Sequence, residues 1–338
     1  MKDLENLGLN FTLKTFIKGR NSNAFYQKLM DYLKFYIEIF RGLFLKNSQF
    51  NKIYVHFPLH VAFLLIFVNK PIFLNFHGSE ISRSNLFSKL LFFFLMKLVE
   101  KRNVQIVVPS HFYKDKVNAI FHLDTKKYIV YPSGGINTSI FKPFTIDKIK
   151  ELKKTYNCQS NSFIIGFTSS LIEDKGVRVF LKTLKKLENI KKIQKLDIFI
   201  VGDGPLKREV EEFVRSYNNS MLFHLLPAQN QKKLSELFNI FDLLVFPSSR
   251  ESLGLIGIEA MACKKVVIAA DNGGVKSYLI NNQNGFLFEK NNDTQLKDKI
   301  LNYINLDKKK LKLIEDQAIN TALLYESKKV NLKLIERL

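Results

Sequence analysis

Short apolar runs alternate with longer amphipathic stretches along the chain, and this alternation predicts the secondary structure. The short runs are rich in Ile, Val, Leu and Phe and predict strands at 8–16, 52–56, 72–76, 105–108, 128–131, 163–167, 196–201, 221–225, 243–246 and 266–269. The stretches between them predict helices at 23–45, 59–68, 86–101, 111–120, 147–156, 177–189, 206–217, 230–239 and 293–303, with one or two more over 307–338. Strands that are apolar on both faces and alternate with helices indicate parallel sheets covered by helices on both sides.

The predicted elements form two groups, and a segment rich in turn-forming residues separates them. Residues 132–143 are dense in Pro, Gly, Ser and Asn, which predicts a connection between domains. We therefore expect an α/β fold of two Rossmann-like, doubly wound domains that face a cleft, over residues 1–145 and 146–321. A C-terminal helix at 322–338 is placed to pack back on the first domain. Ligands in such folds bind at loops that follow the carboxyl ends of the strands.

The sequence carries no pattern typical of a disulfide framework or a metal site. Cys158 and Cys263 are too few for a framework and lack metal-binding spacing. His56 and His60 have helical spacing, but Pro58 lies between them, so we expect no shared metal face.

The apolar segments do not predict a membrane-spanning helix. Segments 59–68 and 86–99 are shorter than the roughly 20 residues that a span needs. The first residues lack the basic and apolar parts of a signal peptide. We therefore expect a cytoplasmic protein, with the cytoplasmic face of the membrane as its candidate position.

Positive charge is in excess, above all in the first half. The net charge is +21, and residues 1–160 contain 24 Lys and Arg against 10 Asp and Glu. Such charge suits nucleic acid, anionic lipid or phosphorylated substrates, or it reflects a lysine-rich composition spread over solvated faces. We expect no nucleic-acid partner, because the chain has no zinc-finger spacing, RNP signature or GXXG loop. The phenylalanine run 92–94 belongs either to a core helix or to one that faces lipid or the acceptor. In the second case Lys89, Lys97, Lys101 and Arg102 would meet anionic headgroups.

Two acidic residues flank a glycine-containing loop after the strand 243–246. Glu251 and Glu259 are eight positions apart, and Gly254 and Gly257 indicate that a helix begins between them. Glu251 then lies in the loop and Glu259 about one to two turns inside the helix. The N–H groups and the dipole of a helix N-terminus attract phosphate. The same spacing fits two ordinary surface acids, so the pattern alone leaves both interpretations open.

Three further loops follow predicted strands or open helices. Lys175-Gly176 places a cation and a permissive turn before a helix, which suits a diphosphate or a capped surface turn. Gly202-Asp203-Gly204-Pro205 and Gly273-Gly274 are turns in which a ligand can approach the backbone closely.

The order of these loops resembles glycosyltransferase family four, the retaining sugar-nucleotide transferases of the GT-B fold. In the second half the resemblance rests on Lys175-Gly176, Val201-Gly202-Asp203-Gly204-Pro205, Pro247-Ser248, the stretch from Glu251 to Glu259, Glu259-Ala260-Met261-Ala262-Cys263, Asp271-Asn272-Gly273-Gly274 and Asn284-Gly285-Phe286-Leu287-Phe288. In the first half it rests on Asn75-Phe76-His77-Gly78, and on Pro132-Ser133-Gly134-Gly135-Ile136-Asn137 with Phe141-Lys142-Pro143. It covers about residues 50–290.

The resemblance implies a role for each matching residue. Three residues would be catalytic: Glu251 would contact the donor-sugar hydroxyls, His77 would line the donor-sugar site, and Lys175 would neutralise the diphosphate. Glu259 would bind the ribose, and further nucleotide-sugar contacts would come from Ser170, Gly202, Gly204, Arg250, Ser252, Leu253, Gly254 and Leu255. The leaving group would depart without a metal or cofactor. Retention would follow from front-face attack, in which the leaving diphosphate takes the acceptor proton.

Two departures from the family pattern bear on activity. Ser170 stands where the family has a phosphate-binding arginine, so we expect weaker diphosphate binding or substitution by Arg178 or Arg250. The family opens with a strand and a glycine-rich loop that help to form the acceptor and phosphate site, and residues 1–22 contain no such loop. We therefore expect a shortened N-terminal domain.

The sequence favours a retaining, hexosyltransferase-type enzyme that moves a sugar from a UDP- or GDP-sugar to a hydroxyl of an acceptor. The acceptor would be a surface glycan, such as lipopolysaccharide or capsule, or a lipid-linked molecule, held by the first domain. The basic charge suits peripheral association with an anionic membrane. The alternative is a catalytically impaired GT-B relative that binds nucleotide sugar or a partner without turnover. GT-B epimerases and phosphorylases also stay open, because the fold does not fix the reaction.

Overall fold

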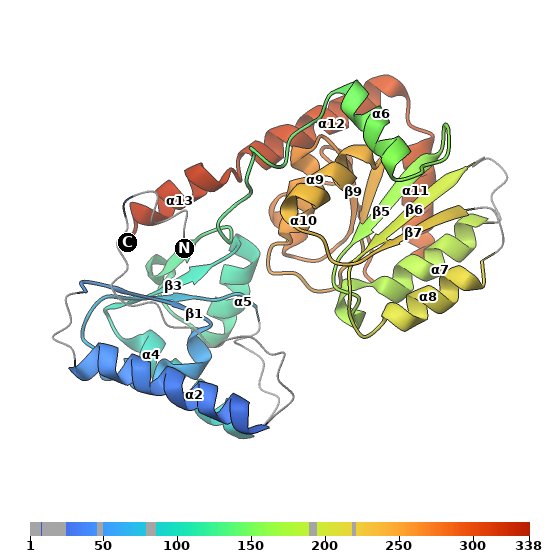
Figure 1. The fold of residues 1–338 in the computed structure, drawn as a ribbon. Coiled ribbons are helices and arrows are strands. Elements are labelled where there is room, and N and C mark those ends of the chain that lie inside the picture. The colour runs from blue at the N-terminus through green and yellow to red at the C-terminus, as the bar shows by residue number, and fades with distance from the viewer. Residues whose placement is uncertain (1–7, 9–24, 46–49, 79–85, 189–194, 218–220) are drawn as a thin grey trace. The chain divides into compact units, whose positions relative to one another are not determined.

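The computed structural model describes residue 8 and residues 25–45, 50–78, 86–188, 195–217 and 221–338. These residues belong to two compact units (Figure 1). Unit 1 comprises Met1–Pro109, Lys114–Tyr131 and Asn331–Leu338, and unit 2 comprises Ser110–Tyr113 and Pro132–Val330. The strand predicted at 8–16 lies outside the described residues except for Gly8, which is in a turn.

Unit 1 is built on a sheet of four parallel strands that follow one another in sequence order. They are β1 (Ile53–His56), β2 (Ile72–Asn75), β3 (Val104–Val108) and β4 (Tyr128–Val130). The helical segments of this part of the chain are α2 (Phe25–Phe40), the π-helix η1 (Arg41–Leu45), the 3-10 turn η2 (Pro58–His60), α3 (Ala62–Leu65), α4 (Leu86–Glu100), α5 (His111–Phe121) and the 3-10 turn η3 (Thr125–Lys127).

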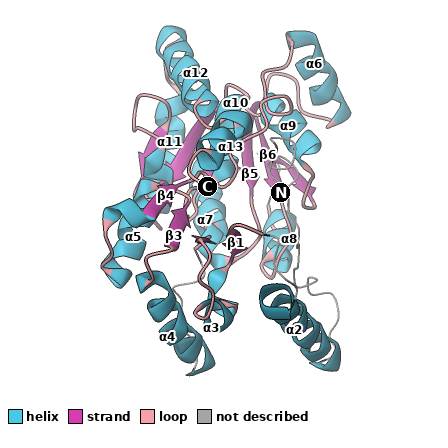
Figure 2. Cartoon of the chain, turned by 90° about the vertical axis from the view of Figure 1, so that its left-hand side faces the viewer, coloured by secondary structure: helices cyan, strands magenta, loops and turns pink. Residues whose placement is uncertain are grey.

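Three helices of unit 1 share an aromatic contact. The ring of Phe63, in α3, lies 5.5 Å from the ring of Tyr36 in α2 and 6.4 Å from that of Phe94 in α4. Figure 2 shows α3 between the other two helices. Phe63 therefore joins α2 to α4.

The helix predicted over 59–68 is shorter than expected, because α3 covers only Ala62–Leu65. The ammonium group of Lys101 donates hydrogen bonds to the carbonyl oxygens of Ile66 and Val68, each at 2.7 Å. A side chain thus satisfies the carbonyl groups that a longer helix would have to pair with backbone.

Unit 2 contains a six-stranded parallel sheet in the order β10-β9-β8-β5-β6-β7. The strands are β5 (Phe163–Thr168), β6 (Leu196–Val201), β7 (Met221–Leu226), β8 (Leu243–Phe246), β9 (Val266–Ala270) and β10 (Phe286–Phe288). The chain builds outward from β5 through β7 and then returns to place β8 on the other side of β5. The boundary between β5 and β8 is therefore the topological switch point, where doubly wound sheets bind ligands.

Helices cover both faces of this sheet. They are α6 (Ile146–Thr155), the 3-10 turn η4 (Glu173–Lys175), α7 (Val177–Glu188), α8 (Lys207–Arg215), α9 (Gln231–Ile240), α10 (Leu255–Ala262), the 3-10 turn η5 (Val275–Ser277), α11 (Asp293–Ile304) and α12 (Lys308–Leu323). Figure 1 shows α7 and α8 on one side of the sheet, with α9 and α10 on the other. Neighbouring residues of one strand enter different cores: Ile164 packs with α9 and α10, and Ile165 packs with α7 and α11. Burial on both faces explains the nearly uniform apolar runs.

The last helix, α13 (Ser327–Ile335), carries the chain from unit 2 into unit 1. Within unit 1, the hydroxyl of Tyr131 donates a hydrogen bond of 2.6 Å to Oδ1 of Asn331. The mixed α/β architecture with parallel sheets confirms the predicted fold class. Among the described residues, no helix is both long and apolar enough to cross a membrane.

Gly166, in the central strand β5, allows Phe241 to pack directly on the sheet. A Cβ atom at this position would lie 2.1 Å from Cε2 of Phe241, whose side chain is completely buried. We predict that Gly166→Ala lowers the free energy of unfolding by about 1 to 3 kcal/mol through overpacking. Adding Phe241→Leu should recover part of this loss, because the smaller side chain relieves the clash. Denaturant unfolding measures both effects, and an unchanged midpoint for Gly166→Ala would contradict this packing.

Candidate functional site

A pocket of about 390 Å³ lies in unit 2 at the carboxyl ends of the central strands. It occupies the switch point between β5 and β8, where the loops that follow these strands diverge. Its lining comes from the ends of β5, β6 and β8 and the loops after them, from η4, from the loop after β7, from α9 and from the start of α10: Thr168, Ser169, Ser170, Lys175, Val201, Gly202, Asp203, Ala228, Gln229, Leu234, Phe246, Glu251, Gly254, Leu255 and Ile256.

The floor of the pocket depends on a close approach between two strand ends. Gly202 follows β6 with φ 154, and a Cβ atom there would lie 1.8 Å from the carbonyl oxygen of Ser169. Thr168 ends β5, and its hydroxyl is buried without a hydrogen-bond partner among the described residues. Only glycine fits at position 202, so backbone atoms rather than a side chain form the floor of the pocket here.

Lys175 and Glu251 form an ion pair inside the pocket. The ammonium nitrogen lies 2.5 Å from Oε1 of Glu251, and both side chains are largely shielded from solvent. The hydroxyl of Ser248 donates to the same oxygen at 2.8 Å. The backbone N–H of Ser249 donates to the carbonyl oxygen of Asp174 at 2.9 Å, which ties the loop after β5 to the loop after β8. The hydrogen bond from Ser248 thus holds the carboxylate of Glu251, and the contact between the two loops holds Lys175 close to it.

The start of α10 faces the same space. Gly254 is the N-cap residue, and it lines the pocket together with Leu255 and Ile256. The hydroxyl of Tyr278 donates to the carbonyl oxygen of Gly254 at 3.1 Å and holds the start of the helix in place. Because the first N–H groups of a helix have no intrahelical partner and carry partial positive charge, this end suits an anion.

Glu259 is the fifth residue of α10 and lies behind the pocket wall rather than on it. Its side chain is buried, and among the described residues it makes no hydrogen bond or ion pair. Burial raises its pKa to about 7. The carboxyl group can therefore be neutral or charged near neutral pH.

The structure brings about half of the predicted nucleotide-sugar residues of unit 2 into one pocket. Those that line it are Ser170, Lys175, Gly202, Glu251, Gly254 and Leu255, and those that do not are Gly204, Arg250, Ser252, Leu253 and Glu259. Lys175 is the one cationic residue in the described lining. Arg178, the candidate substitute for the missing arginine, pairs at the surface with Glu173 and Glu209.

Sequence reasoning missed several lining residues, notably Thr168, Gln229 and Phe246. Each lies at or just beyond the carboxyl end of a predicted strand. Their position after a predicted strand could have identified them as candidate binding residues. They are neither charged nor glycine, which are the residue types on which the prediction relied.

His77 lies in unit 1, where it meets His56. Nδ1 of His56 lies 2.9 Å from Nε2 of His77, and the ring of Phe57 stacks on His77 at 4.4 Å. The amide nitrogen of Asn75 donates to the hydroxyl of Tyr54 at 2.8 Å beside them. Partial burial lowers the pKa of His77, which favours a neutral imidazole. The sequence does not predict this contact, because the two histidines are 21 positions apart.

The chain has the GT-B fold, which is the fold of the solved structures that it matches. HepE of Anabaena in complex with UDP matches with a TM-score of 0.72 at 20% identity, over 86% of this chain and 78% of that chain. A glycosyltransferase from Rickettsia africae matches with a TM-score of 0.71 at 24% identity, over 94% of this chain and 82% of that chain. Residues 148–319, about half of the chain, match the family Glycosyl transferases group 1, and the chain belongs to this family.

Curated relatives match over shorter stretches. An uncharacterized glycosyltransferase of Methanocaldococcus jannaschii is 29% identical over 235 residues, which cover 70% of this chain and 59% of that protein. The capsular polysaccharide biosynthesis glycosyltransferase CapM of Staphylococcus aureus is 25% identical over 224 residues, which cover 63% of this chain and 56% of that protein. This chain therefore spans less than two thirds of the length of these relatives.

The raised pKa of Glu259 predicts a pH-dependent stability. The unfolded carboxyl group ionises near pH 4.3 and the folded one near 7, so the folded state binds more protons between these values. Stability should therefore fall as pH rises from 5 to 8, by about 2 to 3 kcal/mol more in the wild type than in Glu259→Gln. Unfolding curves at several pH values measure this difference. Parallel pH profiles for the two proteins would rule out a buried carboxyl with a raised pKa.

Proposed function

We propose that the protein is a retaining glycosyltransferase that moves a sugar from a nucleotide-diphosphate sugar to an acceptor hydroxyl. The observation that carries this proposal is the pocket at the switch point of unit 2, where Lys175 and the start of α10 converge. The membership of the chain in the family Glycosyl transferases group 1 supports a sugar-nucleotide donor. HepE, which shares the fold, is described in complexes with UDP and with UDP-glucose, and a uridine or guanosine diphosphate sugar is the donor class proposed here.

Each part of the pocket suits one part of such a donor. Lys175 and the N–H groups at the start of α10 provide positive charge for the diphosphate. The glycine backbone at position 202 lets the nucleotide approach β6 closely. Glu259, one helical turn behind Leu255, is the proposed ribose contact, which requires the wall of the pocket to adjust around the ligand.

Lys175 and Glu251 would each interact with a different part of the donor. The diphosphate attracts the ammonium group of Lys175, and Glu251 is then available to the hydroxyls of the donor sugar. Charge that develops on the leaving diphosphate is stabilised by groups that are already in place, so no metal ion or cofactor is required for its departure. The acceptor attacks on the face from which the diphosphate leaves, and the diphosphate takes its proton. His77, whose partial burial favours a neutral imidazole by lowering its pKa, is proposed as a further sugar-binding residue.

The proposed acceptor is a hydroxyl of a surface glycan or of a lipid-linked molecule. The name of CapM describes capsular polysaccharide biosynthesis, and another relative is named a lipopolysaccharide N-acetylglucosaminetransferase. Both names refer to surface glycans, which supports this class of acceptor.

One observation favours a second candidate, an impaired relative that binds nucleotide sugar without turnover. Ser170 lines the pocket where the family pattern has an arginine, and Arg178 is engaged by two surface carboxylates. The described lining then holds a single cation for a diphosphate that carries more than one negative charge.

Activity assays of the wild type and of a Lys175 variant test these two candidates. We predict that Lys175→Ala lowers transfer or hydrolysis of UDP- and GDP-sugars by about 100- to 1,000-fold, the usual effect of removing one preorganised donor to a leaving group. Lys182→Ala, an exposed lysine on α7, is the matched control and should behave as wild type. Product formation is measured with lipid and glycan extracts as acceptors, and calorimetry measures donor binding.

Donor binding by the wild type without turnover in any extract would support the impaired relative. Unchanged turnover in both Lys175→Ala and Glu259→Ala would contradict the glycosyltransferase assignment itself.

Two helices of unit 1 support peripheral association with an anionic membrane. In α2 and η1 the exposed apolar side chains are spaced three and four residues apart, so they form one stripe: Met30, Leu33, Ile37, Phe40 and Phe44. In α4, Leu90 and Phe93 are exposed beside Lys89 and Lys97, and the ammonium group of Lys97 lies 4.9 Å from the ring of Phe93. Apolar side chains mixed with lysines suit a lipid surface. Sequence reasoning singled out α4 and missed α2.

We predict that the protein sediments with vesicles that contain phosphatidylglycerol and that Leu33→Glu with Ile37→Glu weakens this binding at least about 10-fold, because charged groups resist transfer into lipid. Both side chains are half exposed, so the substitutions should leave folding intact. Leu313→Glu, at a similarly exposed leucine of α12, is the control. Equal binding by the double variant and the wild type would show that α2 does not contact lipid.

A further inference from the structure

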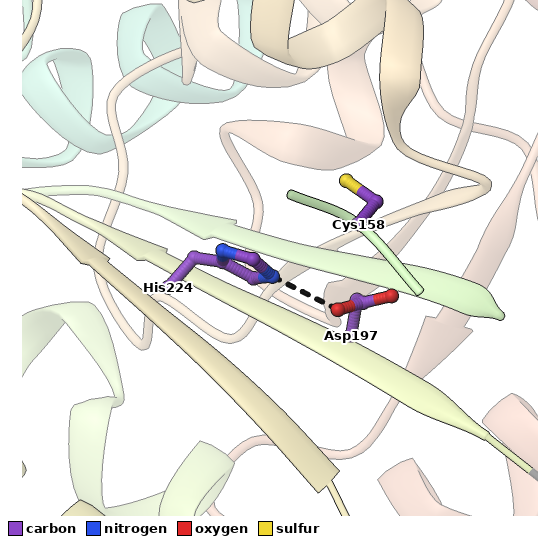
Figure 3. A group of neighbouring side chains, drawn as sticks. All are labelled: Cys158, Asp197 and His224. Atoms are coloured by element: carbon purple, nitrogen blue, oxygen red, sulfur yellow. Dashed lines mark hydrogen bonds and ion pairs between the residues drawn. The ribbon is translucent and has the colours of Figure 1, made fainter. Parts of the chain in front are cut away.

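A cluster of three side chains lies in unit 2 away from the pocket, and Figure 3 draws it. Asp197 is the second residue of β6, His224 belongs to β7, and Cys158 lies in the loop between α6 and β5. Asp197 precedes the pocket residue Val201 by four positions, which places it about 13 Å along the strand from that end. The cluster therefore belongs to a different region of the sheet from the proposed donor site.

The three side chains offer three kinds of metal ligand at one point. One ligand atom from each lies within 4.8 Å of the other two. Nε2 of His224 is 2.9 Å from Oδ1 of Asp197. Asp197 is fully buried, whereas His224 and Cys158 are partly exposed, so an ion has a path to the thiol.

Neighbouring groups hold the carboxylate and the imidazole in position. The second oxygen of Asp197 accepts hydrogen bonds from the backbone N–H of Gln159, at 3.0 Å, and from the hydroxyl of Ser162. The ring of His224 stacks on Phe199 with centroids 4.1 Å apart and planes 9° apart. Supporting contacts of this kind orient the side chains that bind the ion in metal sites. Cys158 adds the thiol from a loop whose next residue, Gln159, already contacts Asp197.

The set of ligands selects the class of metal. Thiolate and imidazole favour Zn²⁺ over magnesium or calcium, which prefer oxygen. Zinc accepts one carboxylate beside sulfur and nitrogen, and its fourth position can hold water. A thiolate and a carboxylate also balance the charge of a divalent ion.

We propose that Cys158, Asp197 and His224 form a zinc-binding site that is separate from the proposed site of glycosyl transfer. On binding, the Cys158 thiol releases its proton to solvent. Nε2 of His224, which carries the proton of the hydrogen bond to Asp197, gives that proton to solvent while Nδ1 takes one up, so the Nε2 lone pair binds the metal in place of the hydrogen bond. The ion then joins the loop after α6 to β6 and β7. Sequence spacing could not reveal this site, because its members are separated by 39 and 27 positions.

The test uses the full chain after chelator treatment, titrated with Zn²⁺ by calorimetry and with Co²⁺ by absorption. We expect one ion per chain, a thiolate-to-Co²⁺ charge-transfer band and a higher Tm with Zn²⁺. Cys158→Ser should abolish the band, and His224→Gln should weaken Zn²⁺ binding by about 100-fold. Cys263→Ala is the matched control, because it removes the other, buried thiol and should retain the band.

Three results would overturn the proposal. They are the absence of stoichiometric Zn²⁺ binding by the wild type, a charge-transfer band that persists in Cys158→Ser, and binding that is lost in His77→Gln but kept in His224→Gln. The last result would assign the ion to the pair of histidines in unit 1. Circular dichroism of each variant checks folding, and the His224→Gln titration decides the question if Cys158→Ser does not fold.

Discussion

The return of the chain to β5 is the constraint on which the candidate site depends. β8 pairs directly with β5, although β6 and β7 come between them in the sequence. Loops after β5 and β8 must therefore leave in different directions, and a pocket opens where they part. The hydrogen bond from Ser249 to Asp174 then ties the two loops together beyond the strands. Lys175 and Glu251 can meet only because this junction exists.

The elements that position the site could be predicted because their patterns are local. β6 has the predicted bounds Leu196–Val201, since all of its residues are buried and the following Gly202 ends the apolar run. Glu251 and Glu259 fall in a loop and in a helix as expected, because Gly254 marks the start of α10. Patterns of this kind depend on residues that are close together in the sequence, so the sequence alone is enough to predict them.

Contacts between distant segments could not be predicted in the same way. Lys175 and Glu251 are separated by 76 positions, and the sequence did not predict that their side chains form a direct ion pair. His77 contacts His56, which lies 21 positions away on the neighbouring strand. His224 meets Asp197 because the register of β6 and β7 sets Phe199 opposite His224. Register and crossing order are properties of the whole sheet, so short motifs do not encode them.

The Lys175–Glu251 pair has a consequence for ligand selectivity. Any anion that enters the pocket must compete with a carboxylate that is already 2.5 Å from the ammonium group and is held there by Ser248. A small anion that draws Lys175 away from Glu251 leaves the carboxylate with its hydrogen bond from Ser248 and offers it no hydroxyl group in exchange. A ligand that also presents hydroxyl groups to Glu251 compensates both partners at once. For a donor of the proposed kind, the closed pair would favour ligands that carry a diphosphate and hydroxyl groups together, and it would limit occupation of the site by inorganic phosphate.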